Sequence, residues 1–349
     1  MTVSFIGSSG VPNRYGGFES FLEHCAPKIA AKGVPVVVTC YSGLYQDQQP
    51  DFRGVHRLFL RVPANGVSSI AHDAIAFLRV FLRSDQIVVL GVSGGLWFPL
   101  FRLLCELTGK RLIVNVDGVE WRRTKFSARK RQLLRLFDTL AQRFSHHVVY
   151  DNAGLYEYLT VSAKKKATCI AYPGDHVLRL KSVERKPRTA LTICRIEPEN
   201  NLELLIDGAL RSTATEYTII GNWSHSEYAR TLRERHSSNT RLRLLDPIYD
   251  PIKLAEFRES CSHYLHGHSV GGTNPSLVEM LFYDCAILCF NVEFNRYTAG
   301  QGAFYFSTAE ELQSALDQPI YPNAADRQNL RSQYTAKAIA DEYLNTILG

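Results

Sequence analysis

The stretch from His266 to Met280, HGHSVGGTNPSLVEM, holds many of the residue types in this chain that can do chemistry. Asn274 and Pro275 suit the N-cap and the first turn of a helix. The free N–H groups of that helix would form an anion site, and Gly271 and Gly272 would let the backbone approach a ligand. The stretch therefore predicts a contact with a phosphate or a sugar.

Glu279 lies one turn into the predicted helix among apolar residues, which indicates a buried carboxylate. Such a group needs a partner, and the sequence leaves two open: a ligand hydroxyl such as that of a ribose, or a group within the protein. His266 and His268 alternate at strand period, so they are expected to face opposite sides, and no third ligand follows at metal spacing. We expect no metal site. A buried, hydrogen-bonded histidine suits His266 better than His268.

Two other loops follow expected strands and carry ligand-binding residue types. In GSSGVPNRYGGFES, Gly16 and Gly17 precede a helix, where backbone N–H groups can reach a phosphate or a sugar hydroxyl. In CRIEPENN, Arg195 directly follows a strand, where a guanidinium can bind a diphosphate. The alternative for Gly16 and Gly17 is that glycine is needed there only for tight turns. The alternative for the loop after Arg195 is ordinary helix capping. A dinucleotide site is disfavoured, because the second strand, VVVTCYSG, ends without an acidic residue.

These loops require a scaffold of alternating strands and helices. Apolar runs such as VSFIG and QIVVLGVSG alternate with helical-period segments, which indicates parallel sheets covered on both faces. The pattern predicts an α/β chain of two doubly wound, Rossmann-like domains. Ligands bind beyond the carboxyl ends of such strands, so two facing sheets would form one cleft. The expected parts are a first domain over 1–175, a polar and basic linker over 176–189, a second domain over 190–323, and a helix over 324–349 that packs back on the first domain.

Composition narrows the class of protein. The 349 residues are 45% hydrophobic and 21% charged, with a net charge of +6, which is typical of a soluble globular protein. Eight scattered cysteines without a CxxC pair indicate a reducing compartment and argue against structural zinc. No signal peptide is visible, and the most apolar run is too short to span a bilayer. We therefore expect a cytoplasmic protein.

A basic stretch from Trp121 to Phe137, WRRTKFSARKRQLLRLF, mixes cations with aromatic residues and leucines. This mixture is typical of helices that lie on an anionic membrane surface, although a solvated helix face is the ordinary alternative. The expectation is peripheral docking on the inner face of the plasma membrane. Nucleic acid is not an expected partner, because no binding motif accompanies the charge.

Seven motifs taken together resemble those of a bacterial rhamnosyltransferase-like branch of glycosyltransferase family 4. They are GVPNRYGGFES, VLGVSGG, NVDGVEWRR, RIEPENN, GNW, DPIYD and HGHSVGGTNPSLVEM. The resemblance implies the GT-B fold, with two Rossmann-like domains facing across a cleft, and metal-independent, retaining sugar transfer without a cofactor. It suggests a dTDP-rhamnose donor and a saccharide or lipid-linked oligosaccharide acceptor in cell-surface polysaccharide synthesis.

Carried over by position, the resemblance assigns residues to a donor side, an acceptor side and a reaction centre. Arg195 would hold the donor diphosphate and Glu279 the ribose. The other nucleotide and phosphate contacts would be Ile248, Tyr249, Gly272, Thr273, Asn274, Pro275 and Ser276, and the donor-sugar contacts His268, Ser269 and Gly271. The acceptor side would comprise Arg14, Tyr15, Gly16, Gly17, Glu120, Trp121 and Arg122. The reaction centre would comprise Asp117, Gly17 and His268.

Gly271 departs from the family pattern. Members of family 4 typically carry a glutamate eight positions before the ribose glutamate, where this chain has Gly271. The departure leaves the donor-sugar contact to backbone groups and His268. Two rival functions stay open: a sugar-nucleotide epimerase of the same architecture, and a non-catalytic protein that binds sugar nucleotides.

Overall fold

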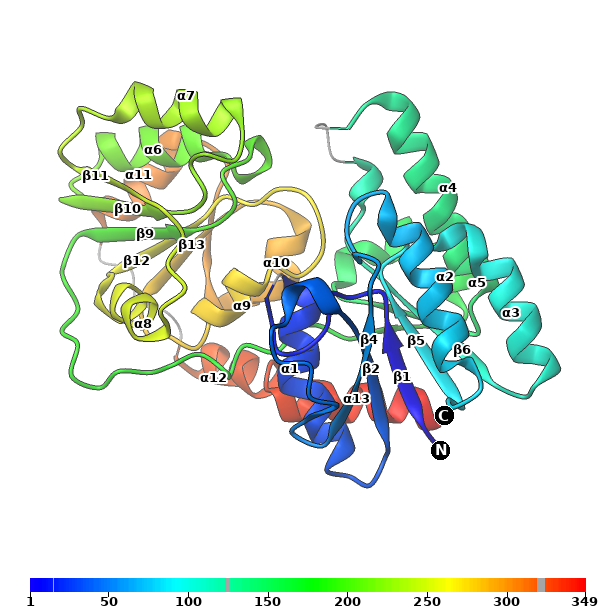
Figure 1. Cartoon of the computed structure of the whole chain (residues 1–349). Coiled ribbons are helices and arrows are strands. Elements are labelled where there is room, and N and C mark those ends of the chain that lie inside the picture. The colour runs from blue at the N-terminus through cyan, green and yellow to red at the C-terminus, as the bar shows by residue number, and fades with distance from the viewer. Residues whose placement is uncertain (15, 123–125, 319–323) are drawn as a thin grey trace. The chain divides into compact units, whose positions relative to one another are not determined.

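The computed structural model of the chain describes residues 1–14, 16–122, 126–318 and 324–349 (Figure 1). The chain divides into two compact units. The first unit combines Met1–Pro173 with Thr335–Gly349, and the second is Gly174–Tyr334. Each unit has its own parallel sheet and its own hydrophobic core.

Eight strands form the sheet of the first unit. They are β1 (Val3–Ile6), β2 (Val36–Tyr41), β3 (Asp51–Phe52), β4 (Val55–Leu60), β5 (Gln86–Leu90), β6 (Arg111–Val116), β7 (His147–Tyr150) and β8 (Ala167–Cys169). Their order is β3-β4-β2-β1-β5-β6-β7-β8, and only the β3–β4 pair is antiparallel. Every residue of β1 and β5 is buried, as expected of central strands covered on both faces.

The helices of the first unit cover both faces of this sheet (Figure 1). They are α1 (Gly17–Ala30), α2 (Ser68–Phe81), α3 (Phe98–Leu107), α4 (Ala128–Phe144), α5 (Val161–Lys164) and α13 (Ala336–Leu348). On one face, α1 and α13 share a core in which the rings of Phe21 and Tyr343 lie 4.4 Å apart. On the other face lie α2, α3 and α4. No helix in the described residues is both long enough and apolar enough to cross a bilayer.

Six parallel strands form the sheet of the second unit. They are β9 (Thr189–Ile193), β10 (Glu216–Ile220), β11 (Leu242–Leu245), β12 (His263–His266), β13 (Ala286–Phe290) and β14 (Phe304–Phe306), in the order β11-β10-β9-β12-β13-β14. The helices are α6 (Leu202–Arg211), α7 (Glu227–His236), α8 (Pro251–Ser260), α9 (Pro275–Met280), α10 (Glu293–Ala299), α11 (Ala309–Asp317) and α12 (Ala324–Gln333). Residues of α6, α7 and α11 share a core with the strands.

The unit boundaries differ from the predicted parts at two places. The segment 176–189, predicted as a linker, belongs to the second unit, where Arg179 bonds Glu259 at 2.7 Å and Asp284 at 3.1 Å. The C-terminal segment 324–349 forms two helices rather than one. Of these, α12 belongs to the second unit and α13 packs against α1.

Candidate functional site

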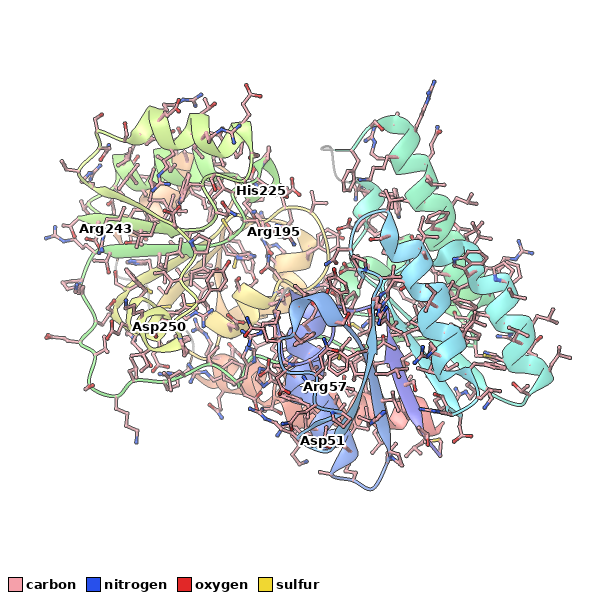
Figure 2. The ribbon with its side chains drawn as sticks, viewed as in Figure 1. Asp51, Arg57, Arg195, His225, Arg243 and Asp250 are labelled. Atoms are coloured by element: carbon pink, nitrogen blue, oxygen red, sulfur yellow. The ribbon has the colours of Figure 1, made fainter. Side chains whose placement is uncertain are left out.

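Connections in the second sheet reverse direction between β9 and β12. Successive strands run outward from β9 to β11 on one side and from β12 to β14 on the other. Ligands of open parallel sheets bind at such a switch point, beyond the carboxyl ends of the strands. The loop after β9 carries Arg195, shown in Figure 2, and the loop after β12 carries His268, Ser269 and Gly271. The structure thus brings these predicted donor residues to one edge of the sheet.

Hydrogen bonds join these two loops directly. Asn201 donates its side-chain N–H to the carbonyl of Gly267 at 2.7 Å. Ser269 donates both its backbone N–H and its hydroxyl to the carbonyl of Glu199, each at 2.9 Å. A Cβ at Gly267 would lie 2.1 Å from the carbonyl oxygen of Asn200, so only glycine permits this approach. The two loops therefore act as one rigid platform.

The imidazole of His268 is oriented by Asn200. The side-chain amide of Asn200 donates to the carbonyl of Arg195 at 2.7 Å, which turns its oxygen toward Nδ1 of His268 at 2.9 Å. Because an amide oxygen only accepts, Nδ1 of His268 carries the proton, and Nε2 is the basic nitrogen of the neutral ring. The backbone carbonyl of His268 accepts from Asn295 at 2.8 Å.

Arg195 is exposed, and its guanidinium takes part in none of the ion pairs or hydrogen bonds found among the described residues. Beside it in sequence, Glu197 is buried and lies 3.9 Å from Nε2 of His225, on the loop after β10. A cation without an acidic partner at a switch point is suited to bind an anionic ligand such as a diphosphate.

The start of α9 agrees with the sequence prediction. Asn274 is the N-cap, and its side-chain oxygen accepts from the backbone N–H of Ser276 at 3.0 Å; Pro275 is the first helical residue. The helix has only six residues and ends at Met280. Pro275 has no N–H, and Asn274 accepts from the N–H groups of Ser276, Leu277 and Val278, so the first turn offers an anion neither free N–H groups nor a long dipole. Thr273 is buried at this turn, and Gly272 is half-buried.

Gly271 has a backbone conformation that side chains rarely adopt. Its φ is +124°, and a Cβ there would lie 3.5 Å from Nε2 of His268, an ordinary contact distance. The constraint is therefore backbone strain rather than lack of space. In this conformation of the loop, a glutamate in place of Gly271 would be strained.

The carboxylate of Glu279 has partners within the protein, one of the two alternatives that the sequence leaves open. Oε2 accepts from Arg258 of α8, and Oε1 lies 3.3 Å from Nε2 of His176. Burial opposes ionisation, but the charges of Arg258 and His176 outweigh it and hold the pKa of Glu279 below its usual value. Glu279 is thus held as a carboxylate at neutral pH.

The hydrogen bonding of His266 and His268 is the reverse of the prediction. Nε2 of His266 is buried and has no hydrogen-bond partner among the described residues, whereas His268 is bonded to Asn200. Burial lowers the pKa of His266 to about 3, so the ring is neutral. Residues two apart in a strand share a face, so the expectation that His266 and His268 face opposite sides was wrong. β12 ends at His266, and the two rings lie 6.2 Å apart. Nowhere in the described ranges do three His, Cys, Asp or Glu side chains gather as metal ligands would.

Ile248 and Tyr249 lie apart from the switch point in the strand order. They follow β11, the edge strand, which β10 separates from β9. Tyr249 is 90% exposed, so its ring is open on nearly all sides. Asp250, the next residue, caps α8 by accepting from the N–H of Ile252 at 2.9 Å.

The glycine-rich loop of the first unit is organised by a residue that the sequence interpretation missed. Gly16 is the N-cap and Gly17 the first residue of α1. In the first turn of α1, Glu19 is buried, and its carboxylate accepts from the backbone N–H of Ser9 at 2.7 Å. Burial raises the pKa of Glu19, although this N–H works against the rise. A buried acid in the first turn after a Gly-Gly pair is the sequence signal that was available.

The other predicted acceptor-side residues occupy two places in the first unit. Arg14 is exposed in the loop after β1, and Tyr15 lies outside the described residues. Asp117 follows β6; it is exposed, and Oδ1 accepts from the N–H of Gly118 at 2.9 Å. Glu120 begins the short 3-10 helix Glu120–Arg122.

Trp121 and Arg122 are held by neighbouring side chains. The indole N–H of Trp121 donates to Asp138 of α4 at 3.0 Å, and the Arg135 guanidinium lies 5.1 Å from its ring. Arg122 bonds the hydroxyl of Tyr158 and lies over its ring. Within the predicted membrane stretch 121–137, residues 123–125 lie outside the part that the structure describes.

A protein-family model described as a domain of unknown function, DUF1972, matches residues 1–175, which is half of the chain. The chain belongs to the DUF1972 family. A comparison with curated proteins found no match.

Solved structures similar to the DUF1972 chain are glycosyltransferases of the GT-B fold. Sucrose-phosphate synthase from Thermosynechococcus elongatus superposes with a TM-score of 0.78 at 11% identity, over 99% of this chain and 97% of that one. The catalytic domain of starch synthase IV from Arabidopsis thaliana gives 0.69 at 13%, over 99% and 98%. The pneumococcal O-GlcNAc transferase GtfA gives 0.57 at 14%, over 79% and 59%. These likenesses confirm the predicted GT-B fold.

The DUF1972 match covers residues predicted for the acceptor side but none of those predicted for the donor side. Residues 1–175 include the loop that ends at Gly16 and Gly17, and Asp117. The switch-point loops with Arg195 and His268 lie beyond that segment. The family match therefore does not extend to the donor-side residues of the second unit.

Proposed function

We propose that this DUF1972 chain is a retaining glycosyltransferase that binds a nucleotide sugar with its second unit and an acceptor with its first. The observation that carries the proposal is the exposed guanidinium of Arg195 on the rigid loop pair at the switch point. Two of the structures with a similar fold hold ADP with acarbose and UDP with GlcNAc, which supports a nucleotide-diphosphate donor here.

The residues of the second unit suit the departure of a diphosphate. Arg195 would stabilise the negative charge that develops on the leaving phosphates, together with the backbone N–H of Gly272. His268, oriented by Asn200, would turn Nε2 to the donor sugar, with Ser269 close by. Because Asn200 holds its ring, His268 would act without reorganising during the reaction.

Glu279 has a defined place in this proposal. Arg258 and His176 hold it as a carboxylate, so it can only accept hydrogen bonds, and a hydroxyl of the ribose or deoxyribose of a nucleotide is a suitable donor. The donor proposed from the resemblance is dTDP-rhamnose, with Tyr249 and Ile248 beside the base and Pro275 and Ser276 near the phosphates.

The acceptor is proposed to bind the first unit, at the carboxyl ends of β1 and β6. Arg14, Gly16, Gly17 and Asp117 lie on the loops there. A saccharide or a lipid-linked oligosaccharide is the proposed acceptor class, which would place the protein at the inner face of the plasma membrane, docked through 121–137. No metal ion or cofactor is part of the proposal.

Titration calorimetry with dTDP-rhamnose, UDP-sugars, GDP-sugars and NAD tests the donor class and the position of its site. Arg195→Ala should weaken binding of the preferred nucleotide sugar about 10- to 100-fold, since a charge-assisted hydrogen bond contributes about 1.5–3 kcal/mol. Arg235→Ala is the matched control, because that residue lies in the last turn of α7, away from the carboxyl ends of the strands. Binding of NAD but of no nucleotide diphosphate would refute the proposal.

Product analysis separates transfer from its rivals. A transferase should release nucleoside diphosphate only slowly without acceptor and much faster with one. Conversion of the donor into an isomer without acceptor would identify an epimerase, and tight donor binding without turnover would identify a binding protein.

A further inference from the structure

The solvent-facing side of α2 is almost entirely apolar. Along the helix and its two flanking residues, exposed apolar side chains recur every three or four residues and so form one stripe. They are Val67, Ala71, Ile75, Leu78 and Leu82. Arg79 is the only polar residue of α2 that is exposed. A surface helix ordinarily turns its polar face to water, so this reversal indicates an interaction surface.

A second stripe lies on α3 and the short 3-10 helix before it. Its members are spaced four, three and four residues apart and are 48–74% exposed: Leu96, Leu100, Leu103 and Leu107. The rings of Phe77 and Phe101 stack at 3.8 Å beneath the two stripes and fix α2 against α3. Figure 1 shows α2, α3 and α4 on the same face of the first sheet, and α4 adds the exposed Leu133 and Leu136.

The described residues of α2, α3 and α4 carry exposed cations but no exposed, unpaired acid. Of the acids on the three helices, Asp73 and Asp138 are buried, and Glu106 accepts from Arg102 at 2.6 Å. The exposed cations on or beside the helices are Arg79, Arg83, Arg129, Lys130, Arg135 and Arg143. The surface therefore combines apolar side chains with net positive charge.

We infer that this surface, formed by α2, α3 and α4, docks on an anionic lipid bilayer. The leucines would enter the boundary between headgroups and acyl chains, and the arginines would meet the lipid phosphates. The inference rests on the membrane location within the proposed function. It extends the contact from the basic stretch 121–137, part of which forms α4, to the leucines of α2 and α3.

A second copy of the chain suits this surface less well than lipid does. A two-fold interface would bring each patch against the same patch of the second copy, which offers its arginines no exposed, unpaired acid on these helices. Anionic headgroups supply the missing negative charge. The charge pattern therefore favours a bilayer as the occupant.

Vesicle co-sedimentation of the full chain tests the inference, with phosphatidylcholine vesicles that contain or lack phosphatidylglycerol. The wild-type chain should bind only the anionic vesicles, and less well as salt rises. Leu100→Glu with Leu103→Glu should lower the affinity at least about tenfold, because each leucine loses its apolar insertion. Leu348→Glu is the matched control: it is 60% exposed at the end of α13, on the opposite face of the sheet, and should leave binding unchanged.

A second variant keeps the test decisive if the leucine variant folds poorly, which its circular dichroism melt would reveal. Arg79→Gln with Arg83→Gln should weaken binding about fivefold per cation, equivalent to about 1 kcal/mol each. Absence of wild-type binding, or equal binding by all variants, would overturn the inference. A dimer that Leu100→Glu with Leu103→Glu dissociates, without vesicle binding, would assign the surface to a second copy instead. Sugar transfer to a soluble acceptor, measured in parallel, reports separately on the proposed function.

Discussion

Replacing Arg258 with methionine tests the most deeply buried ion pair of the candidate site. The methionine keeps much of the apolar volume but removes the charge that faces Glu279, whose side chain is 16% exposed. Removing one partner of a buried pair typically costs about 3–5 kcal/mol, because the other charge is left without compensation. For a unit of this size, about 2–4 °C is lost per kcal/mol, so the melting temperature of the second unit should fall by about 6–20 °C.

A double-mutant cycle shows whether the loss comes from the pair itself. Arg258→Met with Glu279→Gln should recover about 1–3 kcal/mol relative to the sum of the single variants, because no charge is then stranded. Arg233→Met is the control: its partner Asp246 lies at 3.1 Å, but both side chains are exposed, so its loss should stay below about 1 kcal/mol. Strictly additive effects of Arg258→Met and Glu279→Gln would refute the pairing.

The ion pair of Arg258 and Glu279 also predicts how the free energy of unfolding depends on pH. The folded state holds the pKa of Glu279 below its usual value of 4.5, so the stabilisation is fully present above that value and is lost as the pH falls through the lowered pKa. The difference in unfolding free energy between wild type and Glu279→Gln should therefore be constant near neutrality and shrink in acid. Urea titrations at a series of pH values measure this difference, and a difference that grows in acid would contradict the assignment.

Two more predictions follow from single residues. Burial raises the pKa of Asp73 to about 8, with only the N–H of Gly94 opposing it, so the free energy of unfolding should fall as the pH rises from about 4 to 8. Asp73→Asn should remove this loss, so its melting temperature relative to wild type should rise with pH. A difference in melting temperature that does not increase with pH would contradict the raised pKa of Asp73. Gly271→Ala should cost about 1–3 kcal/mol in urea unfolding, because its φ of +124° strains any side-chain-bearing residue, and should weaken nucleotide-sugar binding in calorimetry. Unchanged stability would show that the loop adopts another conformation in solution.

Local sequence patterns were sufficient for the features that neighbouring residues determine. Continuous apolar runs predicted the buried strands β1 and β5, and Asn274 with Pro275 predicted the start of α9. The prediction of two α/β domains is confirmed for the same reason, because each strand and helix in the alternating order has its own local sequence pattern. These features depend on propensity and periodicity, not on distant partners.

Partners distant in sequence explain most of what the sequence interpretation missed. Arg258 lies 21 residues before Glu279 and His176 lies 103 residues before it, so no local pattern reveals that they meet. The basic composition of 176–189 predicts a linker, but the acids that bind Arg179 of this segment lie 80 and 105 residues after Arg179. Asn200 suggested helix capping, and its role in orienting His268 emerges only when two loops of the sheet come together.

The return of α13 to the first unit has a consequence for how the chain is synthesised. Its residues Tyr343 and Ile347 complete the core around Phe5 and Phe21, yet they follow the whole second unit in sequence. At ordinary rates of translation, about 10–30 s separate the end of Met1–Pro173 from the emergence of Thr335. During that interval one face of the first sheet lacks its last helix, so the apolar side chains that Tyr343 and Ile347 later cover are still exposed.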